Sequence, residues 1–179
     1  MLKLVFPVIE DKEEVLKMVR EYEMYPPDVP GVDKFEGIRS FEGMDNYEEW
    51  LRKIEAGRYK ENLPEQYVPA TIYFVKSDDY IVGVIAVRHY LNDDLLRFGG
   101  HIGYSIRPSE RKKGYGSKML NLVLPVCKNE FFINKLLVTC KKQNIGSAKI
   151  IEKNGGVLEN EIYLDDKGHT YKRYWIELI

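Results

Sequence analysis

Cysteine is scarce in this sequence, and long apolar segments are missing. The 179 residues include two cysteines, Cys127 and Cys140, too few for a disulfide framework or a cysteine-rich zinc site. No Asn-x-Ser/Thr acceptor is present, no apolar run is long enough to span a bilayer, and the first residues lack the apolar core of a signal peptide. We therefore expect the fold to begin at Met1, in a reducing cytoplasm, with no membrane partner.

The sequence also lacks an excess of either charge. Its 27 lysines and arginines nearly balance 28 aspartates and glutamates, for a formal net charge of −1. A nucleic-acid partner is not expected, because no basic excess is available to neutralise a phosphate backbone. What is present, 44% hydrophobic and 31% charged residues without internal repeats, is typical of one globular domain, so we expect residues 1–179 to form a single domain.

Hydrophobic periodicity predicts an α+β fold in three layers, with a mixed, mostly antiparallel central sheet flanked by helices. Strands are expected over residues 2–6, 70–76, 80–90, 99–107, 134–140, 157–164 and 169–178. Helices are expected over residues 10–22, 45–57 and 147–154, with a further helix that starts at the glycine turn near residue 114.

Three local signals refine these boundaries. Asp45 is expected to cap the second helix, with Glu48 as its capping-box partner, and Pro125 to kink or end the third. Prolines and glycines cluster between residues 22 and 43, a density that blocks regular structure. Residues 22–66 are therefore expected to form a long arm followed by a helix.

The densest functional signal is the segment RPSERKKGYGSK, residues 107–118, where a strand ends and a helix begins after two glycines. The first amides of a helix have no internal partner and carry partial positive charge, so they favour an anion such as phosphate. Gly114 and Gly116 let the backbone approach an anion without a Cβ in the way. The spacing differs from a P-loop and from a dinucleotide-binding GxGxxG, and the alternative is a solvated basic turn.

These residues resemble a known family. The stretch RKKGYG at 111–116 matches the Q/R-x-x-G-x-G/A signature of the GCN5-related N-acetyltransferases (GNAT), in which the amides of this loop bind the pyrophosphate of coenzyme A. The flanking GYSIRPSERKKGYGSKML and the later LLVTCKKQNIGSAKIIEKNGG are similar to consecutive parts of the same family. The resemblance is close over residues 70–179, whereas residues 1–66 match by element order. It implies the GNAT fold, with the arm and helix of residues 22–66 on the acceptor side.

The resemblance also implies acetyl-CoA as the cofactor and no metal. The strands carrying residues 104–106 and 137–139 would splay apart, and the pantetheine arm would pair with main-chain groups between them. Asn144 and Ser147 would lie near the thiol, although both also suit an ordinary helix start. The residues implied at the cofactor are Ser105, Ile106, Arg107, Arg111, Lys112, Lys113, Gly114, Tyr115, Gly116, Ser117, Asn144 and Ser147.

The implied reaction is direct attack of a primary amine on the acetyl thioester, without a protein nucleophile. The family often has a carboxylate base near the position that His101 occupies here, and an imidazole can accept a proton near neutral pH. His101 is therefore our candidate base, with a structurally satisfied histidine as the alternative. His89 and Glu159 are weaker substitutes.

The general acid is less clear from the family pattern. Seven residues after the asparagine the family frequently has a tyrosine that protonates the departing thiolate, and this chain has Ile151 there. Tyr104 is our candidate acid, and Tyr163, Tyr174 or water are alternatives. Cys140 could instead accept an acetyl group in a ping-pong scheme, or serve as a small apolar residue.

The segment between residues 21 and 50 is strongly acidic. Nine acidic side chains face only Lys34 and Arg39, a local charge of −7: Glu21, Glu23, Asp28, Asp33, Glu36, Glu42, Asp45, Glu48 and Glu49. They would attract a cationic amine such as a polyamine, an aminoglycoside-like base or a lysine-rich peptide, unless they form a solvated face. The interleaved aromatic residues would bind such an amine through cation-π contacts or form a satellite core: Tyr22, Tyr25, Phe35, Phe41, Tyr47 and Trp50.

The leading functional hypothesis is an acetyl-CoA-dependent N-acetyltransferase acting on a small-molecule or peptide amine. A non-catalytic acyl-CoA-binding sensor is the alternative, because Ile151 removes the usual acid. A structural protein with an incidental basic turn is a third. The acceptor and the oligomeric state are left open, with a homodimer as one candidate.

Overall fold

The strands of the protein form two antiparallel sheets. A computed structural model describes residues 1–25 and 46–178. The first sheet has the order β1-β2-β3-β4 and the second the order β5-β7-β6. The strands are β1 Leu2–Val5, β2 Ala70–Ser77, β3 Tyr80–Arg88, β4 Ile102–Ile106, β5 Lys135–Lys141, β6 Val157–Leu164 and β7 His169–Glu177. The α+β class is confirmed, and the expected central sheet is divided between β4 and β5.

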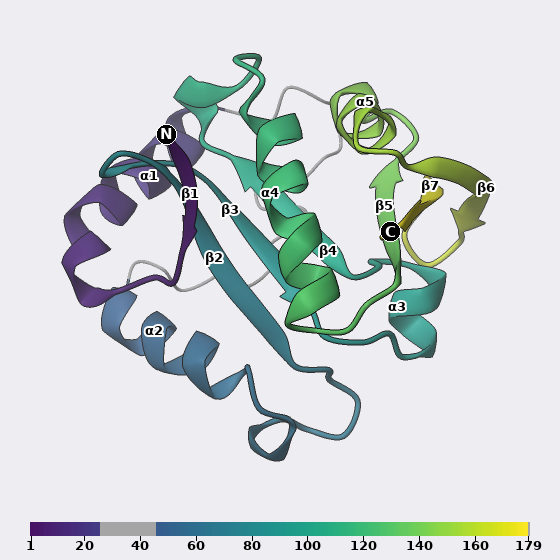
Figure 1. The fold of residues 1–179 in the computed structure, drawn as a ribbon, viewed down its shortest axis with the longest axis horizontal. Coiled ribbons are helices and arrows are strands. Elements are labelled where there is room, and N and C mark those ends of the chain that lie inside the picture. Colours follow the sequence, from purple (N-terminus) through teal and green to yellow (C-terminus); the bar gives the residue numbers. More distant parts are fainter. Residues whose placement is uncertain (26–45, 179) are drawn as a thin grey trace.

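Within the described residues, five helices accompany these sheets (Figure 1). They are α1 Lys12–Met24, α2 Tyr47–Ala56, α3 Asp93–Arg97, α4 Tyr115–Asn129 and α5 Ile145–Lys153, with 3-10 turns at Ile9–Asp11, Lys60–Asn62 and Pro108–Glu110. No helix within the two described ranges is long and apolar enough to cross a bilayer.

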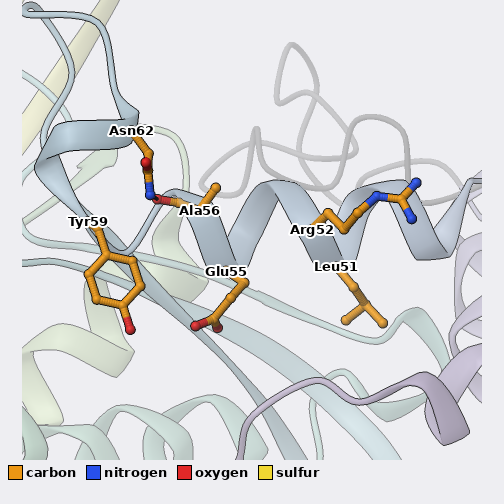
Figure 2. Close-up of a pocket in the computed structure, with 6 residues that line it drawn as sticks. All are labelled: Leu51, Arg52, Glu55, Ala56, Tyr59 and Asn62. Atoms are coloured by element: carbon orange, nitrogen blue, oxygen red, sulfur yellow. Dashed lines mark hydrogen bonds between the residues drawn. The ribbon is translucent and has the colours of Figure 1, made fainter.

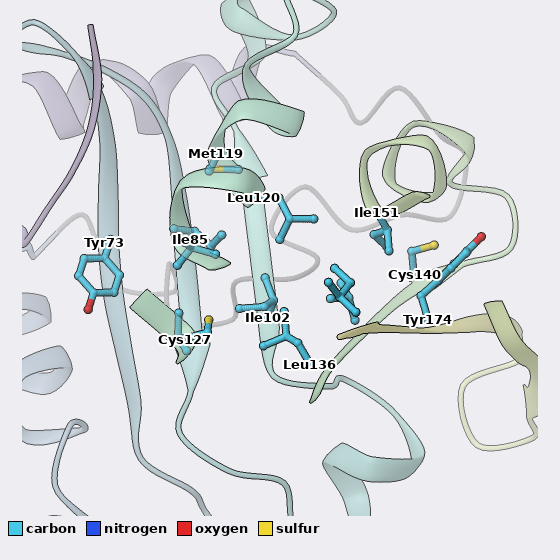
Figure 3. Close-up of a cluster of buried hydrophobic side chains, with 14 of the residues drawn as sticks. Tyr73, Ile85, Ile102, Met119, Leu120, Cys127, Leu136, Cys140, Ile151 and Tyr174 are labelled. Carbon is cyan, nitrogen blue, oxygen red and sulfur yellow. The ribbon is translucent and has the colours of Figure 1, made fainter. Parts of the chain in front are cut away.

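The first sheet separates two hydrophobic cores. One face packs against α4 and continues to α5 and the second sheet, through residues that include Ile85, Met119 and Ile151 (Figure 3). The other face packs against α1 and α2, through residues that include Val15 and Trp50. Because helices cover both faces, β2 and β3 are buried along nearly their whole length, which explains their continuous apolar sequence.

Side chains alternate between the two faces of β4. Ile102, Tyr104 and Ile106 belong to the core beneath α4. On the opposite face, the Ser105 hydroxyl lies 2.7 Å from the Tyr22 hydroxyl of α1. This alternation decides which β4 side chains face α5 and which face α1.

Two helix expectations need correction. Asn46 is the N-cap of α2 and hydrogen-bonds Glu49 at 2.9 Å, whereas the expected cap, Asp45, lies outside the described residues. Helix α4 continues through Pro125 to Asn129. Pro125 is exposed, and so is Asn121, whose carbonyl loses its helical donor, so water can hydrate the interrupted position.

Helix α3 was not expected, because its first residues, Asn92, Asp93 and Asp94, resemble a loop. The Asn92 Oδ1 accepts a hydrogen bond from the Leu95 amide at 2.9 Å, a typical N-cap. The expected cap of α5 is confirmed, since the Asn144 Oδ1 accepts from the Ser147 amide at 3.0 Å.

Candidate functional site

The N-terminus of α4 follows directly on a left-handed glycine. Gly114, at φ 82°, is the N-cap of α4, and no side chain of the described residues caps this end. A Cβ built on Gly114 would meet nothing within 4 Å, so the backbone faces open space. The leading amides of a helix left without caps are suited to an anion. The helix start expected after Gly114 is therefore present, and the binding of an anion there stays a prediction.

Gly116 has a different role from Gly114. A Cβ on Gly116 would lie 2.5 Å from Ile150 Cδ1, because α4 packs closely on α5 at this point. The same contact continues at Ser117, whose carbonyl and hydroxyl oxygens both lie 3.2 Å from the side-chain nitrogen Nδ2 of Asn154. Gly116 and Ser117 thus place the start of α4 relative to α5.

The basic side chains around this helix end are mostly turned to the surface. Lys112 and Lys113 are exposed, and Lys113 pairs with Glu110 at 3.1 Å. The Arg111 guanidinium lies 5.9 Å from the centre of the Tyr22 ring, and Lys118 Nζ lies 6.0 Å from the Tyr115 ring. These cations raise the potential near the Gly114 backbone without filling the space in front of it.

The Arg107 side chain joins α1 to the turn before α4. It is buried and turned toward α1, where it pairs with Glu14 and hydrogen-bonds Glu21 at 2.7 Å. Burial raises the pKa of Glu21, but hydrogen bonds from Arg107 and Ser109 outweigh it and hold that pKa below its usual value. The expected cofactor contact of Arg107 is through its main chain, and it stays a prediction.

The two sheets meet at the segment Gly99–His101. The His101 amide donates to the Leu137 carbonyl at 2.8 Å, and the Gly99 amide donates to Thr139 Oγ1 at 3.2 Å. Beyond this point, β4 pairs with β3 and β5 pairs with β7 among the described residues. The expected separation of the two strands is thus present, and it leaves the β4 edge from Ile102 to Ile106 outside any sheet pairing with β5.

Tyr104 and Ser147 connect β4 to α5 across this separation. Their hydroxyl oxygens lie 2.7 Å apart, and Asn144 holds the Ser147 amide. Burial raises the pKa of Tyr104, and the hydrogen bond to Ser147 offsets part of that rise. Tyr104 is therefore protonated at neutral pH, and its role as the acid stays a prediction.

The other positions considered for the general acid are less suitable. Ile151, which stands where the family frequently has a tyrosine, is apolar and fully buried in the core beneath α4 and α5. The Tyr174 hydroxyl donates to Glu152 at 3.0 Å, and Tyr163 is 61% exposed on the edge strand β6. Cys127 and Cys140 are buried and not joined by a disulfide, and burial raises the pKa of Cys127 to about 12.

The surroundings of His101 disfavour a role as general base. Its ring is buried, and Nδ1 accepts a hydrogen bond from the Leu137 amide at 2.9 Å. Burial and the nearby charge of Arg88 lower the pKa of His101 to about 4, which makes the imidazole a weak proton acceptor. The expectation is corrected to a structurally satisfied histidine, because the ring nitrogen that faces β5 already has a partner.

The substitute bases are also engaged. His89 Nε2 lies 2.8 Å from Thr71 Oγ1, its ring stacks on Phe131, and burial lowers the pKa of His89. Glu159 pairs with Arg173 at 2.6 Å. Neither of these groups lies on the two elements that Tyr104 and Ser147 connect.

The described part of the acidic segment is largely paired. Glu48 bonds Lys12 at 2.6 Å and Glu49 pairs with Lys53 at 2.9 Å. The aromatic side chains Tyr22, Tyr47 and Trp50 are buried in the core under α1 and α2, so the satellite-core alternative is confirmed for these three. The expectations for Asp28, Asp33, Lys34, Phe35, Glu36, Arg39, Phe41, Glu42 and Asp45 lie outside the described residues.

A surface depression of about 480 Å³ lies elsewhere, along α2 and the turn that follows it (Figure 2). Leu51, Arg52, Glu55 and Tyr59 are among its lining residues, and none of the expected site residues contributes. In residues 1–25 and 46–178, no group of three or more His, Cys, Asp or Glu side chains is placed to hold a metal ion.

Comparison with known proteins adds a family match. The model described as "Acetyltransferase (GNAT) domain" matches residues 2–157, most of the chain. Among curated proteins, the uncharacterized N-acetyltransferase YnaD of Bacillus subtilis is 27% identical over 84 residues. That alignment covers 45% of this chain and 45% of the relative, so it spans less than half of YnaD.

Solved structures of acetyltransferases share the whole fold. The microcin C7 self-immunity acetyltransferase MccE, in complex with acetyl-CoA and AMP, has a TM-score of 0.68 at 16% identity, over 98% of this chain and 92% of its own. The ribosomal α-N-protein acetyltransferase RimL, in complex with coenzyme A, gives 0.66 at 15%, over 99% and 94%. Mutant forms of the spermidine/spermine N-acetyltransferase SpeG from Vibrio cholerae give 0.62 at 14%, over 99% and 95%. The expected fold is confirmed.

Proposed function

Because the chain belongs to the GNAT family of acetyltransferases, we propose that it transfers the acetyl group of acetyl-CoA to a primary amine in a ternary complex. One observation carries the proposal: the uncapped N-terminus of α4, opened by Gly114, follows β4, whose outer edge pairs with no other strand of residues 1–25 and 46–178. Coenzyme A has a diphosphate, which requires an anion site, and an arm with amide groups, which can pair with a free strand edge.

The residues present fit acetyl-CoA. The Gly114–Ser117 backbone would hold the pyrophosphate, with Arg111, Lys112 and Lys113 as surrounding cations. The main chain of Ser105 and Ile106 would hold the pantetheine amides, since a strand edge pairs with any extended amide chain. Acetyl-CoA, as a substrate, supplies an acetyl thioester whose C–S bond breaks as the amine nitrogen forms the new C–N bond.

Two protons must move in this reaction. The acceptor amine loses one, and at neutral pH only about one alkylammonium in 2,500 is already neutral. We assign this proton to water, because the candidate bases His101 and His89 are engaged. The leaving sulfur gains the other, and we assign it to Tyr104, whose hydroxyl bridges to Ser147 and Asn144 at the start of α5.

We propose a cationic primary amine as acceptor, either small or part of a peptide. The acidic composition of residues 21–50 supports a cationic acceptor, and two proteins of the same fold are named for acting on spermidine and spermine or on a ribosomal protein. A cytoplasmic location belongs to the same proposal and is supported by two buried cysteines that form no disulfide. The homodimer stays a prediction.

A non-catalytic sensor is the second candidate function. The observation that favours it is Ile151, which is buried in the core where the family frequently has its acid. Such a protein would bind acetyl-CoA and leave the thioester intact. Tyr104 distinguishes the two functions, because its hydroxyl, on β4 rather than on α5, would take the place of the missing acid in an enzyme.

Calorimetric titration with acetyl-CoA and a thiol-release assay across polyamines, aminoglycosides, lysine peptides and N-terminal peptide amines test the proposal together. An acetyltransferase binds acetyl-CoA and releases free thiol with at least one amine. Binding without thiol release above background would favour the sensor. No binding at all would reject both functions and leave a structural protein.

A further inference from the structure

The hydrogen bond from the Leu137 amide to His101 Nδ1 differs from ordinary sheet pairing, because its acceptor is a side chain. The His101 amide donates to the Leu137 carbonyl, as one backbone does to another in a sheet. The Leu137 amide, however, donates to a side chain, His101 Nδ1, at 2.9 Å. A side-chain nitrogen therefore takes the place of a backbone acceptor.

The carbonyls of the segment Gly99–His101 bond Arg88. Its guanidinium donates to the Gly99 and Gly100 carbonyls at 3.1 and 3.0 Å, and its amide donates to the His101 carbonyl at 2.8 Å. These carbonyls are therefore turned to Arg88, and the Leu137 amide bonds the imidazole. The Leu137 amide, which belongs to a fully buried residue, would have no acceptor there without the imidazole.

The turn before His101 is shaped for this contact. Gly99 and Gly100 both have left-handed φ values, 106° and 63°. A Cβ on Gly100 would lie 2.5 Å from the Leu137 carbonyl oxygen, so the two backbones touch at this residue. Such an approach brings the imidazole of the next residue within reach of the Leu137 amide.

We infer that His101 is a positioning residue, whose imidazole supplies the acceptor for the Leu137 amide and so holds β5 against the segment that leads into β4. This inference rests on the proposed function, because the β4 edge beyond this contact is the part assigned to the pantetheine arm. Tyr104 lies three residues further along β4, so the same contact also sets the place of the candidate acid.

Positioning and base catalysis make different demands on the side chain. Positioning needs an acceptor at the place of Nδ1, which the Oδ1 of asparagine supplies. A base needs a titratable nitrogen, which asparagine lacks. His101→Asn and His101→Leu therefore form a matched pair, one keeping an acceptor and the other keeping bulk alone. His169→Asn, at the start of β7, is the control for loss of a histidine.

The first measurement is hydrogen exchange at the Leu137 amide. His101→Leu is expected to speed it at least about tenfold, since the amide loses a buried partner, whereas His101→Asn and His169→Asn keep it within about threefold of wild type. Unchanged exchange in His101→Leu would overturn the inference. This readout needs neither coenzyme A nor an acceptor, so it stands even if the proposed function fails.

The second measurement is kinetic. His101→Leu is expected to raise the KM for acetyl-CoA about tenfold and His101→Asn to restore it to within about threefold, with kcat changing less than KM. Loss of kcat in both variants at unchanged KM would mean that His101 moves a proton, and the inference would be wrong. Absence of any acetyl transfer by the wild type would reject the proposed function instead.

Nitrogen-15 NMR of the unmodified protein covers the case in which His101→Leu does not fold. A nitrogen that accepts a hydrogen bond carries a lone pair, so His101 is expected as the neutral tautomer with its proton on Nε2 at pH 7. A proton found on Nδ1 would exclude the bond from Leu137 and overturn the inference without any variant.

Discussion

The Tyr104 hydroxyl, 2.7 Å from the Ser147 hydroxyl, makes the first prediction at the scale of single residues. Tyr104→Phe removes the proposed proton donor and keeps the ring in the core. We expect kcat to fall about a hundredfold while the Kd for coenzyme A stays within about twofold. Steady-state kinetics and calorimetry measure the two quantities.

Tyr67→Phe, at a tyrosine 58% exposed and outside the proposed site, is the matched control for Tyr104→Phe. Full activity in Tyr104→Phe would mean that water, and not Tyr104, protonates the leaving sulfur. A parallel loss of coenzyme A affinity would instead show that the hydroxyl shapes the binding site.

His101 gives a prediction for stability against pH. Its folded pKa of about 4 lies below the ordinary 6.5, so the unfolded chain takes up this proton first as the pH falls. The stability associated with neutral His101 is thus complete above about pH 6.5 and is lost on the way down to about pH 4. Between pH 7 and 4.5 we expect wild type to lose about 2 kcal/mol more than His101→Asn.

Urea unfolding of both proteins at the two pH values measures this difference, because the carboxylates shared by the two proteins cancel in the comparison. Equal losses would mean that the folded state does not depress the pKa of His101.

At the scale of elements, two substitutions at the start of α4 distinguish the effect of charge on coenzyme A binding from the effect of side-chain size. Gly114 is left-handed with open space before it, and asparagine tolerates that conformation better than most residues. Gly114→Asp places a negative charge at the proposed pyrophosphate site, and Gly114→Asn places a neutral group of the same size there. We expect Asp to weaken coenzyme A binding at least about tenfold and Asn to change it no more than about threefold. Calorimetry with coenzyme A decides, and equal losses would remove the anion site.

The contact between α4 and α5 gives a prediction about stability rather than binding. Gly116→Ala puts a methyl group 2.5 Å from Ile150 Cδ1, and we expect it to destabilise the fold by about 1–3 kcal/mol. Gly146→Ala in α5 is the control, since its Cβ would lie 3.7 Å from Asn144 Oδ1 and alanine favours a helix. Denaturant unfolding measures both, and a neutral Gly116→Ala would mean that the helices yield at this contact.

At the scale of the whole molecule, the proposed site lies between two sheets that share one core. Coenzyme A at a hundred times its Kd is expected to stabilise the native state by about 2.7 kcal/mol. For a domain of this size, the melting temperature then rises by about 5–10 °C in a single transition. Scanning calorimetry with and without coenzyme A tests this. Two transitions, of which one shifts, would show that the ligand does not hold the two sheets together.

Local signals in the sequence determined most of the elements and the loop at the centre of the proposal. Strands β2 and β3, the glycine turn at 114–116 and the Asn144 cap all depend on residues close in the chain, so periodicity and capping chemistry identified them. The errors were local as well: α3 is too short for a clear period, and the effect of Pro125 depended on its exposure.

Tertiary structure alone decided what the polar side chains do. His101 meets Leu137, 36 residues away, Tyr104 meets Ser147, 43 residues away, and Arg107 meets Glu21, 86 residues away. Sequence patterns tell which face of a strand a side chain occupies, but its partner is set by the packing of distant segments. Because burial and partners fix the pKa and the hydrogen bonds of a group, the sequence by itself determined the acetyltransferase fold and the glycine turn before α4. Packing decided that His101 meets the Leu137 amide, that Arg107 pairs with α1, and that the Tyr104 hydroxyl bonds Ser147.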